Sequence, residues 1–115
     1  MRIHVLEKAP GVFIASLDGE FDMSTSPAVR GALVPLFRRH RISQVIVDLS
    51  AVPYIDSSGF ATLVEGLQLS RKGNIRFTLA GATSSVEAVF DLAYLRDVFE
   101  MVPSVSDLFG DEEPQ

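Results

Sequence analysis

The sequence predicts an α/β fold in a single domain: a mixed sheet of four to five strands with helices packed against it. The first observation is the order of apolar strands and amphipathic helices, which is β-β-α-β-α-β-α-(β)-α. The second is the length, because 115 residues suffice for one hydrophobic core and leave no room for a second. The third is a composition of 47% hydrophobic and 22% charged residues, which is typical of a globular domain. An opening hairpin followed by alternating strands and helices implies right-handed crossovers between parallel strands.

A hairpin is expected first, with strands near Arg2–Glu7 and Val12–Leu17 and a tight turn at Ala9-Pro10-Gly11. An acidic loop, Gly19-Glu20-Phe21-Asp22, follows the second strand. The hydroxyls and the proline of Ser24-Thr25-Ser26-Pro27 then predict a helix start with side-chain capping.

The first helix has a buried face with helical spacing, formed by Val29, Ala32, Leu33, Leu36 and Phe37. An interior proline, Pro35, opposes the helix. Because Gly31 occupies the position where the proline ring clashes, we expect a kinked helix that continues. The basic cluster 38–41 follows, where cations complement the negative end of the helix dipole.

The second half of the chain continues the alternation. Gln44–Leu49 is a nearly continuous apolar strand, and Phe60, Leu63, Val64 and Leu67 mark one face of a helix that ends near Lys72-Gly73. Alternating apolar residues from Ile75 to Leu79 predict a fourth strand. A third helix is expected from about Thr83 to Tyr94, with its inward residues being Val86, Val89, Phe90 and Ala93. A short strand at Val98–Val102 and a helical turn at Ser104–Phe109 complete the domain, 1–109, and residues 110–115 are expected to form a disordered acidic tail.

Composition also excludes several classes of function. With no cysteine there is no disulfide, thiolate nucleophile or cysteine-bound metal. A net charge of −5 argues against direct nucleic-acid binding. No apolar run reaches the length of a membrane span and no signal segment opens the chain, so we expect a cytoplasmic protein.

The tetrapeptide Asp56-Ser57-Ser58-Gly59 lies between the apolar strand and the second helix. Asp and Ser are preferred at a helix start, so we expect Asp56 and Ser58 to cap it, while Gly59 permits a tight entry. A phosphate on a serine here would be stabilised by the helix dipole and the free N–H groups, and would bring about −1.5 to −2 charges beside Asp56. The tetrapeptide therefore has two interpretations, an ordinary cap and a reversible switch.

Three other chemistries have weaker support. A serine hydrolase requires a histidine base, and only His4 and His40 exist, neither of them near the tetrapeptide. No glycine-rich phosphate loop occurs, so no cofactor is expected. Asp18, Glu20, Asp22 and Asp56 are candidates for a cation site, but lack the regular spacing of a calcium loop.

The tetrapeptide and the acidic loop each follow a strand and precede a helix. If those strands are parallel neighbours, the two loops lie side by side at the carboxyl ends, where α/β sheets place their sites.

The stretches Gly19-Glu20-Phe21-Asp22 and VIVDLSAVPYIDSSGF resemble the G-E-x-D segment and the central signature of STAS domains, specifically the stand-alone anti-sigma factor antagonists of bacteria. The resemblance covers about Ile3 to Phe109. Phe60 stands where an aliphatic residue is more usual, and Pro27 and Pro35 are departures in the first helix.

The resemblance implies partner switching by a protein that is not an enzyme. An anti-sigma factor, which is also an ATP-dependent serine kinase, phosphorylates Ser57. The unphosphorylated form binds the anti-sigma factor and so frees the sigma factor, and a metal-dependent serine phosphatase resets the switch. The resemblance also implies that Asp22 and Glu20 belong to the neighbouring acidic loop, that Asp56 supports the acceptor, and that Ser58 and Gly59 shape the helix start.

Chains that resemble this family also serve as accessory subunits of membrane transport systems or as scaffold modules of signalling complexes. In these the hydroxyl is only a structural or contact group. That alternative stays open at the level of sequence.

Overall fold

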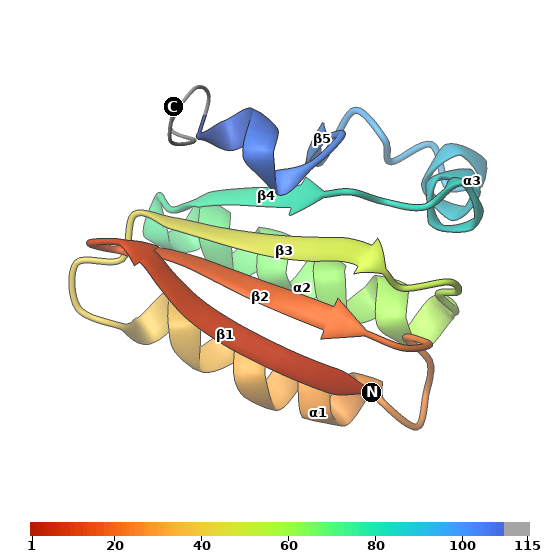
Figure 1. Ribbon diagram of the computed structural model, residues 1–115, viewed down its shortest axis with the longest axis horizontal. Helices are drawn as coiled ribbons and strands as arrows, with labels where there is room; N and C mark the ends of the chain where they lie inside the picture. Colours follow the sequence, from red (N-terminus) through yellow and green to blue (C-terminus); the bar gives the residue numbers. More distant parts are fainter. Residues whose placement is uncertain (110–115) are drawn as a thin grey trace, which may run out of the picture.

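A five-stranded mixed sheet organises the computed structural model, which describes residues 1–109 (Figure 1). The predicted acidic tail, 110–115, lies outside the described residues. β1 (Arg2–Ala9) pairs antiparallel with β2 (Val12–Asp18). β3 (Gln44–Ala51), β4 (Arg76–Ala80) and β5 (Glu100–Val102) then follow β2 in parallel, in chain order across the sheet. The predicted fold class is confirmed, including the fifth strand.

One face of the sheet packs against the helices α1 (Ser26–Leu33), α2 (Ser57–Gly73) and α3 (Ser84–Leu92). In Figure 1, α1 and α2 lie together behind the sheet, and α3 lies at the end where β2 and β3 terminate. A short 3₁₀ helix, η2 (Val105–Leu108), packs on the opposite face over an apolar cluster formed by Ile14, Ile46 and Ala80.

The main core lies between the sheet and the helices. β3 is its centre, because Val45, Val47 and Leu49 are wholly inaccessible to solvent. Burying side chains of this size contributes about 1.5–3 kcal/mol each before the entropy of folding is subtracted. Near α3 the core is aromatic, with the Phe90 ring 4.9 Å from that of Phe60 and 5.2 Å from that of Phe99 in edge-to-face contacts.

The first helix differs from the predicted kinked helix. α1 stops at Leu33 and the chain continues as a 3₁₀ helix, η1 (Val34–Arg38), with Pro35 in its first turn. Proline has no N–H to donate, so a change of helix type replaces the expected kink. The predicted buried face survives the change, since Val29, Leu33, Leu36 and Phe37 are buried.

The third helix is shorter than predicted, and the expected inward position of Ala93 is wrong. α3 ends at Leu92 because Tyr94 adopts a left-handed backbone with φ 58°, which turns the chain away and leaves Ala93 exposed. The second helix ends near Lys72-Gly73 as expected, but the left-handed residue there is Asn74 rather than the glycine.

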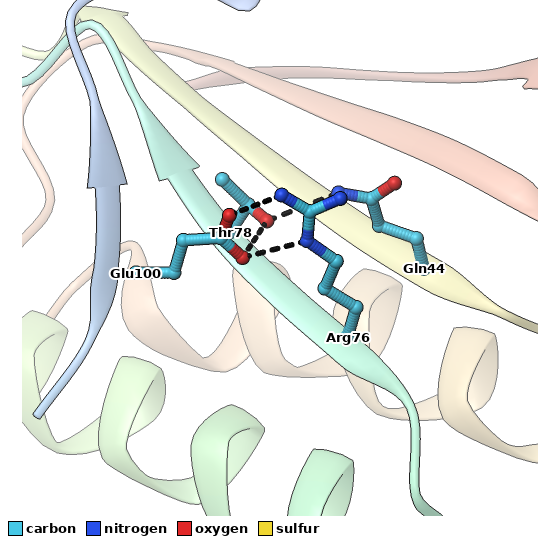
Figure 2. Close-up of polar contacts among 4 residues, drawn as sticks. All are labelled: Gln44, Arg76, Thr78 and Glu100. Atoms are coloured by element: carbon cyan, nitrogen blue, oxygen red, sulfur yellow. Dashed lines mark hydrogen bonds and ion pairs between the residues drawn. The ribbon is translucent and has the colours of Figure 1, made fainter. Parts of the chain in front are cut away.

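A polar network fastens the short edge strand β5 to the sheet. Figure 2 shows Arg76 forming a two-pronged ion pair with Glu100, in which Nε donates to Oε1 at 2.8 Å and Nη2 donates to Oε2. The Thr78 hydroxyl also donates to Glu100, at 2.8 Å, and accepts from the Gln44 amide at 3.0 Å. Three neighbouring strands are thereby joined through side chains.

Candidate functional site

The loops that follow β2 and β3 lie side by side and are hydrogen-bonded to each other beyond the ends of their strands. The Gly19 N–H donates to Ala51 at 3.0 Å and the Phe21 N–H donates to Tyr54 at 2.9 Å. The Phe21 carbonyl in turn accepts from the Asp56 N–H at 3.1 Å. The adjacency expected from the strand order is therefore confirmed, and the two loops form one braced unit.

Asp56, in the loop that follows β3, connects the start of the second helix to the acidic loop through its two carboxylate oxygens. Oδ1 accepts from the N–H groups of Ser58 and Gly59 at 2.8 and 3.0 Å, which caps α2. Oδ2 accepts from the Met23 N–H at 3.1 Å, across 33 positions of sequence. One side chain thus closes the helix start and ties the two loops together.

The two serines of the tetrapeptide have different environments. Ser57 is the first residue of α2 and is exposed, whereas Ser58 is half-buried. Within residues 1–109, neither hydroxyl has a hydrogen-bond partner. The cap belongs to Asp56, so the expectation that Ser58 also caps is wrong. Of the two hydroxyls, that of Ser57 is the more exposed to solvent.

The surroundings of a phosphate on Ser57 differ from those expected from the sequence. Two of the N–H groups that we expected to receive it, those of Ser58 and Gly59, already donate to Asp56 Oδ1. A phosphate on Ser57 would therefore meet the carboxylate of the preceding residue and fewer free donors than expected. Its dominant local effect is like-charge repulsion.

Gly59 is required by close packing between the first turn of α2 and the acidic loop. A Cβ atom at this buried position would lie 2.5 Å from the Phe21 carbonyl oxygen and 2.9 Å from the Ile55 side chain. No larger residue fits without separating the loops, so the glycine does more here than permit a tight turn.

Asp22 organises the acidic loop from within. Its Oδ1 accepts from the Ser24 hydroxyl at 2.7 Å and from the N–H groups of Ser24 and Thr25 at 3.0 and 3.1 Å. These bonds, the one from the Ser24 hydroxyl foremost, hold the pKa of Asp22 below its ordinary value. The loop thus carries a fixed negative charge at neutral pH, and the exposed side chain of Glu20 adds another.

The hydroxyls predicted to cap α1 brace this loop instead. Thr25 stands at the N-cap position, but its side chain makes no capping hydrogen bond. Its Oγ1 accepts from the Asp22 N–H at 2.9 Å and donates to the Glu20 carbonyl at 2.9 Å. The start of α1 relies on the proline in its first turn.

A cation site is not supported by the geometry. Among residues 1–109 there is no cluster of three or more acidic or histidine side chains suited to a metal ion. The carboxylates of Asp22 and Asp56 are already occupied by backbone donors.

A concavity of about 700 Å³ lies on the face of the sheet opposite the helices, lined in part by His4, Ser16 and Asp48. These residues stand opposite one another in register on three adjacent strands, with the serine in the middle. A catalytic triad needs the histidine between serine and carboxylate. The arrangement therefore does not support hydrolase chemistry.

Sequence reasoning missed several residues of the site. Phe21 supplies the backbone bridge to Ile55, and Met23 supplies the N–H that binds Asp56. Met23 and Tyr54 are also large apolar side chains with 74% and 50% exposure, and they belong to the two loops that are hydrogen-bonded to each other. The one available signal was an apolar residue, Met23, in the middle of a polar loop.

In the described part of the chain, no helix has both the length and the apolar character that a bilayer span requires. The STAS domain profile matches residues 4–108. Among curated proteins, the anti-sigma-B factor antagonist of Staphylococcus epidermidis is 29% identical over 83 residues, which are 72% of this chain and 76% of that protein.

Solved structures show the same fold. An anti-sigma factor antagonist from Mycobacterium paratuberculosis superposes with a TM-score of 0.80 at 27% identity, covering 94% of this chain and 92% of that one. The Bacillus cell fate determinant SpoIIAA in its phosphorylated form superposes with a TM-score of 0.76 at 15% identity, covering 94% and 96%.

Proposed function

Because the chain belongs to the STAS domain family, we propose that it is an anti-sigma factor antagonist that switches partners through reversible phosphorylation of Ser57. The observation that carries the proposal is the exposed, unbonded Ser57 hydroxyl at the start of α2, on two loops braced by Asp56. The relatives named as anti-sigma factor antagonists support it.

The proposed partner of the unphosphorylated form is an anti-sigma factor that is also a serine kinase. Binding to it releases the sigma factor, and a serine phosphatase later restores the unmodified chain. In this scheme the protein is a substrate and a binding partner, not an enzyme. The ATP and metal ions of the cycle belong to the kinase and the phosphatase.

Charge supplies the physical basis of the switch. A phosphate adds about −1.5 to −2 charges at pH 7. It would do so directly after Asp56 in the sequence, on two joined loops that already carry the charges of Asp56 and Asp22. Unfavourable charge contacts at an interface cost several kcal/mol, and every ~1.4 kcal/mol is tenfold in affinity. A loss of affinity of this size needs no large conformational change.

The other proposed site residues prepare this surface. Asp56 fixes the helix start, Asp22 and Glu20 carry the charge of the neighbouring loop, and Gly59 allows the two loops to touch. Ser58 contributes its backbone N–H to the cap.

Phosphopeptide mapping tests the proposal. The protein is incubated with ATP and its anti-sigma factor kinase, and digests are analysed by mass spectrometry. We expect one phosphate on Ser57, none in Ser57→Ala, and unchanged modification in the matched control Ser58→Ala. Continued phosphorylation of Ser57→Ala, together with loss of phosphorylation in Ser58→Ala, would identify Ser58 as the acceptor and refute the assignment of Ser57.

A further inference from the structure

The end of α3 carries the two most exposed large apolar side chains among residues 1–109. Leu92, the last residue of the helix, is 81% exposed and Tyr94 is 91% exposed. Single exposed apolar residues are common on protein surfaces, so exposure alone has little meaning. Three further observations concern this pair.

The first observation is backbone strain at Tyr94. The Leu95 N–H donates to the Phe90 carbonyl at 3.0 Å and the Tyr94 N–H donates to the Asp91 carbonyl at 3.1 Å, which is the hydrogen-bond pattern of a Schellman motif. Tyr94 holds its left-handed position, with φ 58°. Glycine or asparagine is usual there because other side chains are disfavoured. A tyrosine at this position lowers stability without burying its ring, which favours a role outside folding.

The second observation is the location of the pair relative to Ser57. Phe60, three residues after Ser57 in the first turn of α2, packs against Phe90 with 4.9 Å between ring centroids. Leu92 follows Phe90 by two residues. α3 lies at the end of the sheet where β2 and β3 terminate, the end that carries the two braced loops (Figure 1).

The same end of the molecule also carries Met23 and Tyr54. With exposures of 74% and 50%, they are the next most exposed large apolar side chains after Tyr94 and Leu92. The four most exposed large apolar side chains of the described chain thus gather around one end of the sheet. Tyrosine in particular is enriched in the residues that dominate binding energy at protein interfaces.

The third observation is charge. Tyr94, Asp91, Arg96 and Asp97 line a concavity of about 340 Å³. Arg96 forms ion pairs with Glu87 at 3.4 Å and with Asp91 at 3.5 Å. Because Asp97 adds a third carboxylate to this one arginine, the net charge of the rim is negative. The neighbouring loops add Glu20, Asp22 and Asp56, so the complementary surface is basic.

We propose that Leu92 and Tyr94 form a second contact site for the same anti-sigma factor kinase that modifies Ser57. The surface of that partner offers an apolar recess bordered by basic residues, into which the two side chains insert. This inference rests on the function proposed above and adds a docking contact to the acceptor loop. Docking at α3 holds the kinase on the antagonist while Ser57 enters its active site.

The test compares Leu92→Ala/Tyr94→Asn with wild type and with Leu6→Ala, a control that removes an exposed side chain from β1. Affinity for the kinase is measured by calorimetry, and phosphorylation of Ser57 by steady-state kinetics. We expect the double variant to bind at least tenfold more weakly and to show a raised KM with kcat unchanged. Leu6→Ala should stay within twofold of wild type.

Thermal unfolding separates docking from a structural role. Because asparagine accepts the left-handed backbone, Tyr94→Asn should unfold at the same temperature as wild type or higher. A lowered Tm that accompanies the lost affinity would overturn the docking role.

The remaining outcomes distinguish the inference from the proposed function. Affinity within twofold of wild type, with Ser57 still phosphorylated in wild type, overturns the α3 contact and leaves the proposed function standing. Wild type that neither binds the kinase nor is phosphorylated overturns both.

Discussion

Asp56 is the residue on which the geometry of the candidate site depends. Its two oxygens serve a helix start and a loop that are distant in sequence. A typical intramolecular hydrogen bond contributes about 0.5–1.5 kcal/mol of net stability. Removing the side chain would release both the cap and the acidic loop.

Two substitutions separate these roles. Asparagine caps a helix about as well as aspartate, so Asp56→Asn should keep the cap, lose the bond to Met23 and cost about 1 kcal/mol of unfolding free energy. Asp56→Ala loses both contacts and should cost about 2–3 kcal/mol. Urea unfolding measures both values, with Asp97→Asn and Asp97→Ala as the exposed control pair. An Asp56→Asn variant as stable as wild type would show that the link between the loops contributes nothing, and equal costs for the two Asp56 variants would show the same of the cap.

The sequence predicted only part of the role of Asp56. A cap depends on neighbours two and three residues away, so residue preferences were enough to suggest it. The bond to Met23 depends on the parallel pairing of β2 and β3, and no local pattern encodes it. The role of Thr25 was not predicted for the same reason. Its hydroxyl was expected to cap α1, but it forms hydrogen bonds within the acidic loop.

At the scale of elements, the edge strand β5 depends on Glu100. This three-residue strand is joined to β4 by the contacts of Glu100 with Arg76 and Thr78. The ion pair with Arg76 lowers the pKa of Glu100 below its ordinary value. A carboxylate with a lowered pKa in the folded state stabilises the fold above its unfolded pKa, and that stabilisation is lost as the pH falls through the folded pKa.

We therefore expect Glu100→Gln to destabilise the protein at pH 7 by up to about 1 kcal/mol, as is usual for a partly exposed ion pair. The deficit should shrink as the pH falls below the ordinary glutamate range. Thermal unfolding of the variant and wild type from pH 7 to pH 3 measures it. Asp107→Asn, which removes an equal charge without breaking an ion pair among the described residues, is the control. A deficit that stays constant with pH would argue against the ion pair.

Periodicity predicted the elements well where packing and local preference agree. The order of elements along the chain, the second helix and the buried face of the first helical segment followed from it. The deviations occur where one residue imposes its backbone. Pro35 converts the end of the first helix into a 3₁₀ turn, and Tyr94 ends α3 early. A tyrosine carries no sequence signal for a left-handed conformation, so that boundary was not predictable.

At the scale of the whole molecule, charge is distributed unevenly along the sheet axis. Glu20, Asp22 and Asp56 lie beyond the carboxyl ends of β2 and β3. The cations that precede β3 and β4, at the opposite end, are Arg38, Arg39, Arg41, Arg71 and Lys72. A polar charge distribution orients a charged partner during its approach. Phosphorylation would deepen the acidic end, where the proposed contacts lie.

The central claim is that modification of Ser57 alone controls binding of the anti-sigma factor. Calorimetric titration of that partner with the unphosphorylated protein and with the homogeneous Ser57 phosphoprotein tests it most directly. We predict that the phosphate raises the dissociation constant at least a hundredfold, which corresponds to about 2.7 kcal/mol of binding free energy. The Ser57→Ala variant should bind like the unmodified protein. Equal affinity of the phosphorylated and unphosphorylated forms would contradict the account.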